Sequence, residues 1–250
     1  MYYFASDAHF GLKLYEDPIQ AQKRFVRWMD SIKATCEGLF LVGDMFDYWY
    51  EYRSVAPRGF SRFLGKLSEF HDAGIPVFIF NGNHDIWLWD YLEKECGVKV
   101  IDDVWQEELC GKRFYVTHGD GLGDPSWSFR FLRCFFRNKF CQFLYSWLHP
   151  DLTIPFGFKW ANHSRKSKQG KVTESFLGED KEFQLIWAKQ HLAEHKNVDF
   201  YIFGHRHIAK MFDIESDSAK AKVAILGEWM TQFTYGVFDG EHFELKSFTD

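Results

Sequence analysis

The sequence predicts an α/β layered fold, in which β-strands alternate with helices. Over the first 120 residues, short apolar runs alternate with longer segments whose apolar residues recur at helical spacing. A chain of 250 residues can bury a large core without disulfides, and its 46% hydrophobic and 26% charged residues are an ordinary globular balance. The aromatic content is unusual, because 28 Phe, 11 Tyr and 10 Trp make up 20% of the chain. This excess needs a separate explanation.

The individual elements can be placed in order along the chain. Residues 2–5 begin with a buried strand. Asp17 followed by Pro18 marks a helix start, because aspartate caps helices and proline suits the first helical position. Further helices are expected near 60–70, at 87–95 and near 182–195. Further strands are expected at 38–42, 76–80, 98–101, 104–109, 113–117 and 200–203, with strands and turns over 209–248.

Residues 127–171 interrupt this alternation with a different composition. Twelve of the 34 residues from 127 to 160 are aromatic, and the segment carries nine Lys or Arg against a single acid, Asp151. Its net charge is therefore +8, while the rest of the chain sums to −13. We expect an inserted helical lid over 127–171 and a core formed by 1–126 and 172–250. Read as one helix, the lid has an apolar face of Phe129, Leu132, Phe136, Phe140, Phe143 and Trp147 beside a basic strip of Arg130, Arg133 and Arg137.

The global composition argues against several classes of protein. A net charge of −5 gives no sign of a nucleic-acid binder. The five cysteines are scattered without a CxxC pair, so neither a disulfide framework nor a thiolate zinc site is expected. A strand that begins at residue 2 leaves no room for a signal peptide. The sequence contains no run of 18 apolar residues, so no membrane-spanning helix is expected. We therefore expect a cytoplasmic protein.

Five predicted strands run directly into residues that can bind metals. Asp7 and His9 are two positions apart, so an extended backbone would point both side chains the same way, and a second such pair follows at 205 and 207. Because ligands of open α/β sheets bind beyond the carboxyl ends of the strands, the five clusters should converge. Glycines at 43, 82, 119 and 204 would permit tight turns there. The clusters are Ser6-Asp7-Ala8-His9, Gly43-Asp44-Met45-Phe46-Asp47, Asn81-Gly82-Asn83-His84-Asp85, His118-Gly119-Asp120 and Gly204-His205-Arg206-His207.

The mixture of carboxylate and imidazole side chains favours Mn, Fe or Zn over Ca or Mg. Each cluster alone could be a capped turn with a surface histidine. Five clusters in order, each at a strand end, instead predict two metal ions that share a carboxylate, because seven candidate ligands are too many for one tetrahedral ion. The candidates are Asp7, His9, Asp44, Asn83, His118, His205 and His207.

This pattern of D-x-H, GD-x-x-D, GNH-D, H and GH-x-H resembles that of the calcineurin-like metallophosphoesterases and extends from residue 7 to residue 207. The resemblance implies a two-layered β-sandwich flanked by helices, and two metal ions that activate water for attack on a phosphorus atom. The ligands it implies are Asp7, His9 and His207 for one ion and Asn83, His118 and His205 for the other, with Asp44 bridging the two.

Three more residues of the pattern have implied roles. Asp47 and Asp85 would support the metal ligands from behind. By the same resemblance, His84 would be a catalytic residue that does not bind metal. It would stabilise the transition state or protonate the leaving oxygen.

Residues 4–9, 43–49 and 161–168 resemble one branch of this family, the UDP-2,3-diacylglucosamine diphosphatases of lipid A synthesis in Gram-negative bacteria. The resemblance implies a peripheral enzyme on the anionic surface of the inner membrane. Its lipid-linked nucleotide substrate would be split into UMP and 2,3-diacylglucosamine 1-phosphate. Acyl chains would enter the lid, since each buried methylene contributes about 0.8 kcal/mol. By analogy, the substrate contacts are Asp124, Asn162, Ser164, Lys166 and Lys168.

His84 departs from this branch, whose best-known members carry arginine there. The alternative is therefore a metallophosphoesterase that acts on another lipid-linked or nucleotide phosphoester. The lid could also be a helix docked on the core with its arginines solvated. A non-enzymatic scaffold and a nuclease are weaker alternatives, because no metal ligand is missing and the chain outside the lid is acidic. We expect two divalent ions, with Mn²⁺ ahead of Fe or Zn, a monomer and no nucleic-acid partner.

Overall fold

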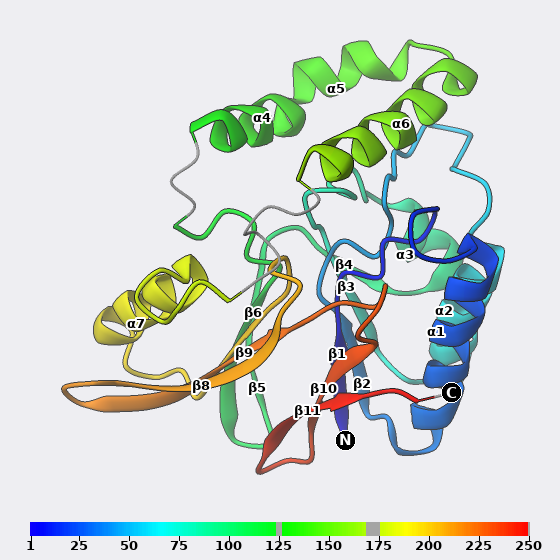
Figure 1. The fold of residues 1–250 in the computed structure, drawn as a ribbon. Helices are drawn as coiled ribbons and strands as arrows, with labels where there is room; N and C mark the ends of the chain where they lie inside the picture. Colours follow the sequence, from blue (N-terminus) through cyan, green and yellow to red (C-terminus); the bar gives the residue numbers. More distant parts are fainter. Residues whose placement is uncertain (124–126, 169–175, 250) are drawn as a thin grey trace.

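The computed structural model describes residues 1–123, 127–168 and 176–249, and for 127–130 and 162–168 it describes the backbone alone. Two sheets lie against each other with helices outside them, and a further group of helices lies beyond one end of the strands (Figure 1). The α/β layered fold expected from the sequence is thereby confirmed.

The first sheet has six strands, and its central strands are parallel. Hydrogen bonding runs in the order β11 (Phe243–Ser247), β10 (Thr234–Phe238), β1 (Tyr2–Ala5), β2 (Gly38–Leu41), β3 (Val77–Phe80) and β4 (Lys99–Ile101). The strands β1 to β4 are parallel, whereas β10 is antiparallel to β1 and to β11. Because β1 to β4 are parallel, their carboxyl ends lie at one edge of the sheet.

Three helices cover the outer face of this sheet: α1 (Pro18–Ile32), α2 (Ser61–Asp72) and α3 (Tyr91–Cys96). A short 3₁₀ turn, η1 (Lys33–Thr35), follows α1. The expected helix start is confirmed, because the Asp17 carboxylate accepts hydrogen bonds from the Ile19 and Gln20 amides and Pro18 is the first helical residue.

The second sheet has five strands, in the order β5 (Val104–Leu109), β6 (Lys112–Thr117), β7 (Phe200–Phe203), β9 (Ala219–Leu226) and β8 (Ala209–Ser216). The inner faces of the two sheets pack through phenylalanines. Phe4 of the first sheet stacks on Phe40 at 4.7 Å between ring centroids and on Phe114 of the second sheet at 5.9 Å. The helix α7 (Phe183–Glu194) covers the outer face of the second sheet. Much of the aromatic excess therefore lies in the core.

The segment between β6 and α7 forms three helices, α4 (Trp127–Arg137), α5 (Lys139–Ser146) and α6 (Pro150–Lys168), called the helical segment below. These helices lie above the upper ends of the strands in Figure 1. No helix in the described parts of the chain is both long and apolar enough to cross a membrane.

Two helix predictions were wrong in detail. The single helix expected across Phe129–Trp147 is broken at Asn138, which has extended backbone and accepts hydrogen bonds from the Phe140 and Cys141 amides, so that a new helix begins. The helix expected over 87–95 begins only at Tyr91. The Glu51 carboxylate accepts hydrogen bonds from the amides of Trp89, Asp90 and Tyr91. These bonds hold the chain before Tyr91 outside the helix.

Candidate metal centre

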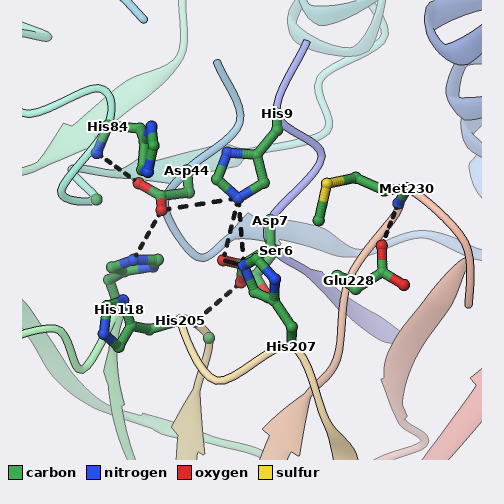
Figure 2. A network of polar contacts seen from close by, with 12 residues as sticks. Ser6, Asp7, His9, Asp44, His84, His118, His205, His207, Glu228 and Met230 are labelled. Atoms are coloured by element: carbon green, nitrogen blue, oxygen red, sulfur yellow. Dashed lines mark hydrogen bonds and ion pairs between the residues drawn. The ribbon is translucent and has the colours of Figure 1, made fainter. Parts of the chain in front are cut away.

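The ends of five strands bring histidines and carboxylates together at the upper edge of both sheets (Figure 2). The contributing strands are β1, β2, β3, β6 and β7, as the sequence predicted. The residues that meet there are Asp7, His9, Asp44, His84, His118, His205 and His207.

The first group consists of Asp7, His9 and His207, whose ligand atoms lie within 4.8 Å of one another. The Nε2 atom of His207 lies 3.1 Å from Asp7 Oδ1, and His9 Nε2 lies 3.6 Å from the same oxygen. The two Nε2 atoms are only 3.3 Å apart. Two imidazole nitrogens and a carboxylate oxygen therefore face one point.

The second group consists of Asp44, His118 and His205, within the same 4.8 Å limit. His118 Nε2 lies 3.4 Å from Asp44 Oδ2, and the same oxygen lies 3.8 Å from His9 Nε2 in the first group. Asp44 therefore stands between the groups, where a shared carboxylate would be needed. His84 also has a ligand atom within 4.8 Å of those of His9 and Asp44.

The hydrogen bonding of these residues fits metal ions. The Nδ1 atom of His118 lies 2.9 Å from the carbonyl oxygen of Val42, which can only accept, so in the neutral ring that binds a metal Nδ1 carries the proton and Nε2 has the lone pair. His118 Nε2 and the Oδ1 atom of Asn83 are buried, and neither has a hydrogen-bond partner among the described residues. Unpaired buried acceptors are costly unless something binds them, and a cation would satisfy both.

The local field also favours positive charge. Burial alone would raise the pKa of Asp7 and Asp44, but the neighbouring histidines hold the pKa of both carboxyls well below its ordinary value. Burial alone would lower the pKa of His118, yet Asp44 holds it well above its usual range. The pKa of His205 falls to about 4 through burial and the nearby His118. The carboxylates thus stay ionised in a buried site.

Asp47 and Asp85 lie directly behind the two groups. Asp85 accepts hydrogen bonds from the amides of Gly82, Asp44 and Phe46 and so joins two of the ligand-bearing loops. Burial and the charge of Asp44 raise the pKa of Asp85 to about 7. The Oδ1 atom of Asp47 lies 3.7 Å from His9 Nδ1. Both carboxyls are therefore placed to orient other residues.

The backbone at the centre is unusual, and one expectation about it was wrong. Asp7 and His9 were expected on extended backbone, but their φ angles are 55° and 46°, in the left-handed region. Among the described residues, five of the seven non-glycine residues with positive φ belong to the centre, the other three being Asp44, His205 and His207. Such conformations cost energy and persist only where the surroundings hold them. The side chains converge because the backbone twists at each of these residues.

Two of the expected turn glycines serve a different purpose. Gly43 and Gly119 have positive φ, of 80° and 89°, as a tight turn requires. Gly82 does not, but a Cβ there would lie 2.1 Å from Asp44 Oδ1. Likewise, a Cβ at Gly204 would lie 2.8 Å from Asp7 Oδ2. These two positions need glycine because a carboxylate lies against the backbone.

Glu228 is a supporting residue that the sequence analysis missed. It is 2% exposed, lies in the loop between β9 and β10, and accepts hydrogen bonds from the amides of Met230, Thr231 and Gln232. Figure 2 shows the bond from Met230. The same loop holds the main chain of the first group: the Trp229 amide donates to the Asp7 carbonyl at 3.1 Å, and Gln232 Nε2 donates to the His207 carbonyl at 2.8 Å. No motif in the sequence marks this loop.

A buried ion pair, also missed, fixes the second histidine pair. Arg206, between His205 and His207, donates from Nε to Glu182 Oε1 at 2.6 Å and from Nη2 to Oε2 at 3.1 Å. Glu182 directly precedes α7, so the pair ties this histidine loop to that helix. The position of Arg206 between two candidate metal ligands could have predicted from the sequence that it has a buried acidic partner.

The helical segment is joined to the core by charge. Arg133 Nε lies 3.0 Å from Asp120 Oδ2, and Arg133 Nη2 lies 3.5 Å from Asp103. Arg137 Nη1 lies 3.8 Å from Asp102. The alternative in which the arginines are merely solvated is therefore wrong for these two, while the side chain of Arg130 lies outside the described residues.

An apolar cavity of about 230 Å³ lies between the helical segment and the loops of the centre. Tyr48, next to Asp47, and Trp87, two residues after Asp85, form the wall on the side of the metal centre. Hydrogen bonds hold the two sides together, since Trp87 Nε1 donates to the Phe136 carbonyl at 3.0 Å. The wall formed by the helical segment includes Leu132, Phe135, Phe136, Phe156 and Trp160.

The predicted substrate contacts cannot be placed in the same way. Asp124 lies outside the described residues. The other four are on α6, where only their backbone is described: Asn162, Ser164, Lys166 and Lys168. All five stay predictions.

Comparison with known proteins gives a consistent picture. A sequence model of the family described as calcineurin-like phosphoesterase matches residues 2–209. The UDP-2,3-diacylglucosamine hydrolase of Porphyromonas gingivalis is 39% identical over 258 residues, which cover 99% of this chain and 97% of the relative. The hydrolases of the same name from Vibrio parahaemolyticus and Stutzerimonas stutzeri are 24% and 28% identical, over 89% and 88% of this chain and 89% of each relative.

Proposed function

Because the chain belongs to the calcineurin-like phosphoesterase family and is a metal-dependent hydrolase, we propose that it hydrolyses UDP-2,3-diacylglucosamine to UMP and 2,3-diacylglucosamine 1-phosphate. The observation that carries this proposal is the position of the apolar cavity, whose walls continue the loops that bear Asp47 and Asp85. A phosphoester bond and an acyl chain of one molecule could thus be held side by side.

We assign Asp7, His9 and His207 to one divalent ion and Asn83, His118 and His205 to a second. Asp44 would bridge the two. The grouping of ligand atoms within 4.8 Å supports this assignment for the histidines and aspartates. The buried, unpartnered Oδ1 supports it for Asn83. Mixed carboxylate and imidazole ligands favour Mn²⁺, with Fe or Zn as alternatives.

The reaction adds one water molecule across the pyrophosphate. Its oxygen attacks the α-phosphorus, the bond from that phosphorus to the bridging oxygen breaks, and the bridging oxygen leaves on the diacylglucosamine phosphate. Two bound cations would supply Lewis acidity that activates the water and neutralises charge on the phosphoryl oxygens. The Asp85 carboxylate accepts main-chain hydrogen bonds from the loops after β2 and β3, which keeps the residues on these two loops in fixed positions.

The hydrogen bonds of His84 support a role in handling the proton of the leaving group. Its Nδ1 lies 3.0 Å from the Asp47 carbonyl oxygen, which can only accept, so Nδ1 carries a proton and Nε2 is the atom that exchanges one. Its amide donates to Asp44 Oδ1 at 2.8 Å, which positions the residue beside the shared carboxylate. We propose that protonated His84 delivers a proton to the leaving oxygen.

We further propose that residues 127–171 act as a lid over a core of 1–126 and 172–250. The apolar cavity supports acyl binding, because its lining is almost entirely apolar and aromatic. Acyl chains in this cavity would contribute most of the affinity for substrate, at about 0.8 kcal/mol per buried methylene.

The decisive test supplies UDP-2,3-diacylglucosamine and Mn²⁺ to the wild type and to Asp44→Ala, and measures UMP and the lipid monophosphate. We expect release of both products by the wild type only. UDP-glucosamine, which lacks acyl chains, serves as the matched substrate and should be cleaved at least about 100-fold less efficiently. Equal cleavage of both substrates would instead favour a phosphoesterase of other specificity.

The outer face of the helical segment supports a location at an anionic inner-membrane surface. Trp147, Leu152 and Phe140 are 77%, 72% and 67% exposed, which is unusual for large apolar side chains. Basic residues of the same segment that are not paired with the core in the described parts of the chain, such as the exposed Lys159, would meet anionic lipid headgroups.

Sedimentation with vesicles tests this location. The Trp147→Ser, Leu152→Ser double variant should lose most of its binding to phosphatidylglycerol vesicles, because two inserted side chains are removed. Ile19→Ser, which changes an exposed apolar residue of α1, is the control and should bind as the wild type does. Equal sedimentation of all three proteins would contradict the membrane assignment.

A further inference from the structure

A second cavity, of about 350 Å³, lies over the carboxyl ends of β3 and β4. Asn81 directly follows β3 and Asp102 directly follows β4, and both line this cleft. The strands β1 to β4 are parallel neighbours, so this is the same sheet edge that bears Asp7 and Asp44. The cleft therefore lies beside the metal centre, one strand further along the same edge of the sheet.

The cleft contains polar atoms whose bonding is incomplete. Asn81 is 5% exposed, and its Nδ2 donates to Asp102 Oδ1 at 2.9 Å, which fixes the amide so that Oδ1 is the remaining acceptor. In the parts of the chain that the structure describes, Asn81 Oδ1 has no hydrogen-bond partner, and neither does the buried Nε of Arg137. One acceptor and one donor are therefore left to a bound molecule.

The remaining walls suit a flat ring with a polar attachment. The Trp89 indole is 40% exposed and lines the cleft together with Leu88 and Ile86. Lys139 adds a cationic side chain from α5. Gln142 lines this cleft and also the apolar cavity, so the two cavities are neighbours.

We propose that this cleft binds the uracil nucleoside half of the substrate, an inference that rests on the proposed function. The imide edge of uracil has one N–H between two carbonyl oxygens. Its N3–H would donate to Asn81 Oδ1, and an adjacent carbonyl oxygen would accept from Arg137 Nε. The ring would stack on Trp89.

This pairing predicts discrimination between bases. The N3 atom of cytosine has no hydrogen and would place a second acceptor against Asn81 Oδ1. A buried site with an unmatched polar group rejects such an analogue. UMP should therefore bind more tightly than CMP, although the two differ only at this edge of the ring.

The test measures equilibrium binding of UMP and CMP to the Mn²⁺-loaded enzyme by calorimetry. We expect UMP to bind about 10–100-fold more tightly than CMP. Asn81→Ala and Arg137→Met should each weaken UMP binding about tenfold or more and reduce the preference over CMP. Lys159→Met, which changes an exposed lysine of α6 outside the cleft, is the matched control and should bind UMP normally.

The outcomes separate this site from the reaction itself. Equal binding of UMP and CMP, or wild-type UMP binding by both cleft variants, would overturn the nucleoside site even if UMP is released from the lipid substrate. Uracil preference that depends on Asn81, without turnover of the lipid substrate, would support the site and overturn the proposed reaction. The metal content of Asn81→Ala is measured as well, because Asn81 is two residues from Asn83. If metal is lost, Arg137→Met decides.

Discussion

The metal centre and the apolar cavity lie side by side but are held in different ways. At the metal centre, left-handed backbone at Asp7, His9 and Asp44 aims the side chains. The buried Asp85 carboxylate holds the Asp44 amide, and the carbonyls of Gly43 and Asp44 hold the amides of Asp7 and His9. In the apolar cavity, aromatic side chains from the helical segment and from the loops after β2 and β3 form the walls. The chemistry needs atoms at fixed positions, whereas an acyl chain needs only volume and an apolar lining. Substitutions in the two regions should therefore change different measured quantities.

The largest expected effect that is confined to one of the two regions is that of His84→Ala. Loss of proton delivery should lower turnover by about 10²–10⁴-fold, with metal content and affinity for the acylated substrate unchanged. Metal analysis of the purified variant and steady-state kinetics check this. His242→Ala, an exposed histidine far from the centre in sequence, is the control. Loss of a metal ion from His84→Ala would show that His84 is a ligand, as its place beside His9 and Asp44 would permit.

Glu228→Gln should come next, because it weakens the support of the first ligand group without touching a ligand. Loss of the carboxylate that holds residues 230–232 should reduce affinity for one metal ion about 10–100-fold, since the loop holds the carbonyls of Asp7 and His207. A Mn²⁺ binding isotherm measures this, and excess Mn²⁺ should restore turnover.

The matched control is Glu51→Gln. Glu51 is 5% exposed and accepts hydrogen bonds from three main-chain amides at the start of α3. Glu51→Gln should therefore lower the free energy of unfolding by about as much as Glu228→Gln does. Its metal isotherm should equal that of the wild type. If both variants bind Mn²⁺ normally and merely unfold more easily, Glu228 has only a structural role.

Gly157→Ala should have the smallest effect, confined to the apolar cavity. An added Cβ would lie 2.3 Å from the Tyr48 ring, and such overpacking typically costs about 1–3 kcal/mol. We expect a raised KM for the acylated substrate with unchanged metal affinity. Gly65→Ala in α2, where a Cβ meets no atom within 4 Å, should instead raise the free energy of unfolding by about 0.5–1 kcal/mol. An altered metal-binding isotherm of Gly157→Ala would contradict the claim that changes in the apolar cavity leave the metal centre unaffected.

Local patterns in the sequence were enough to predict most strands and the convergence of the candidate ligands. Apolar runs ending in Asp or His predicted β1, β2 and β7 within one residue, because strand and turn signals are local. The parallel order of strands then brought distant motifs to one edge.

What the sequence did not predict depends on contacts between distant residues. The positive φ of His9 follows from the packing around it and not from its own preference. Glu51 shortens α3 from about 40 positions away, and Glu228 acts on Asp7 from the far end of the chain. The break at Asn138 was a local capping signal, but the regular apolar spacing on both sides concealed it.

The pairing of distant segments also determines when the centre can form. His9 and His207 are 198 positions apart, yet their ring nitrogens lie 3.3 Å from each other, and β1 pairs with β10 near the end of the chain. Contacts of such high sequence separation form slowly, because loop closure must precede them. During synthesis, an emerging chain would contain Asp7, His9 and Asp44 before their partners that follow β7 have been made. Metal binding by the complete ligand set is therefore a late step of folding, and it indicates that both sheets have formed.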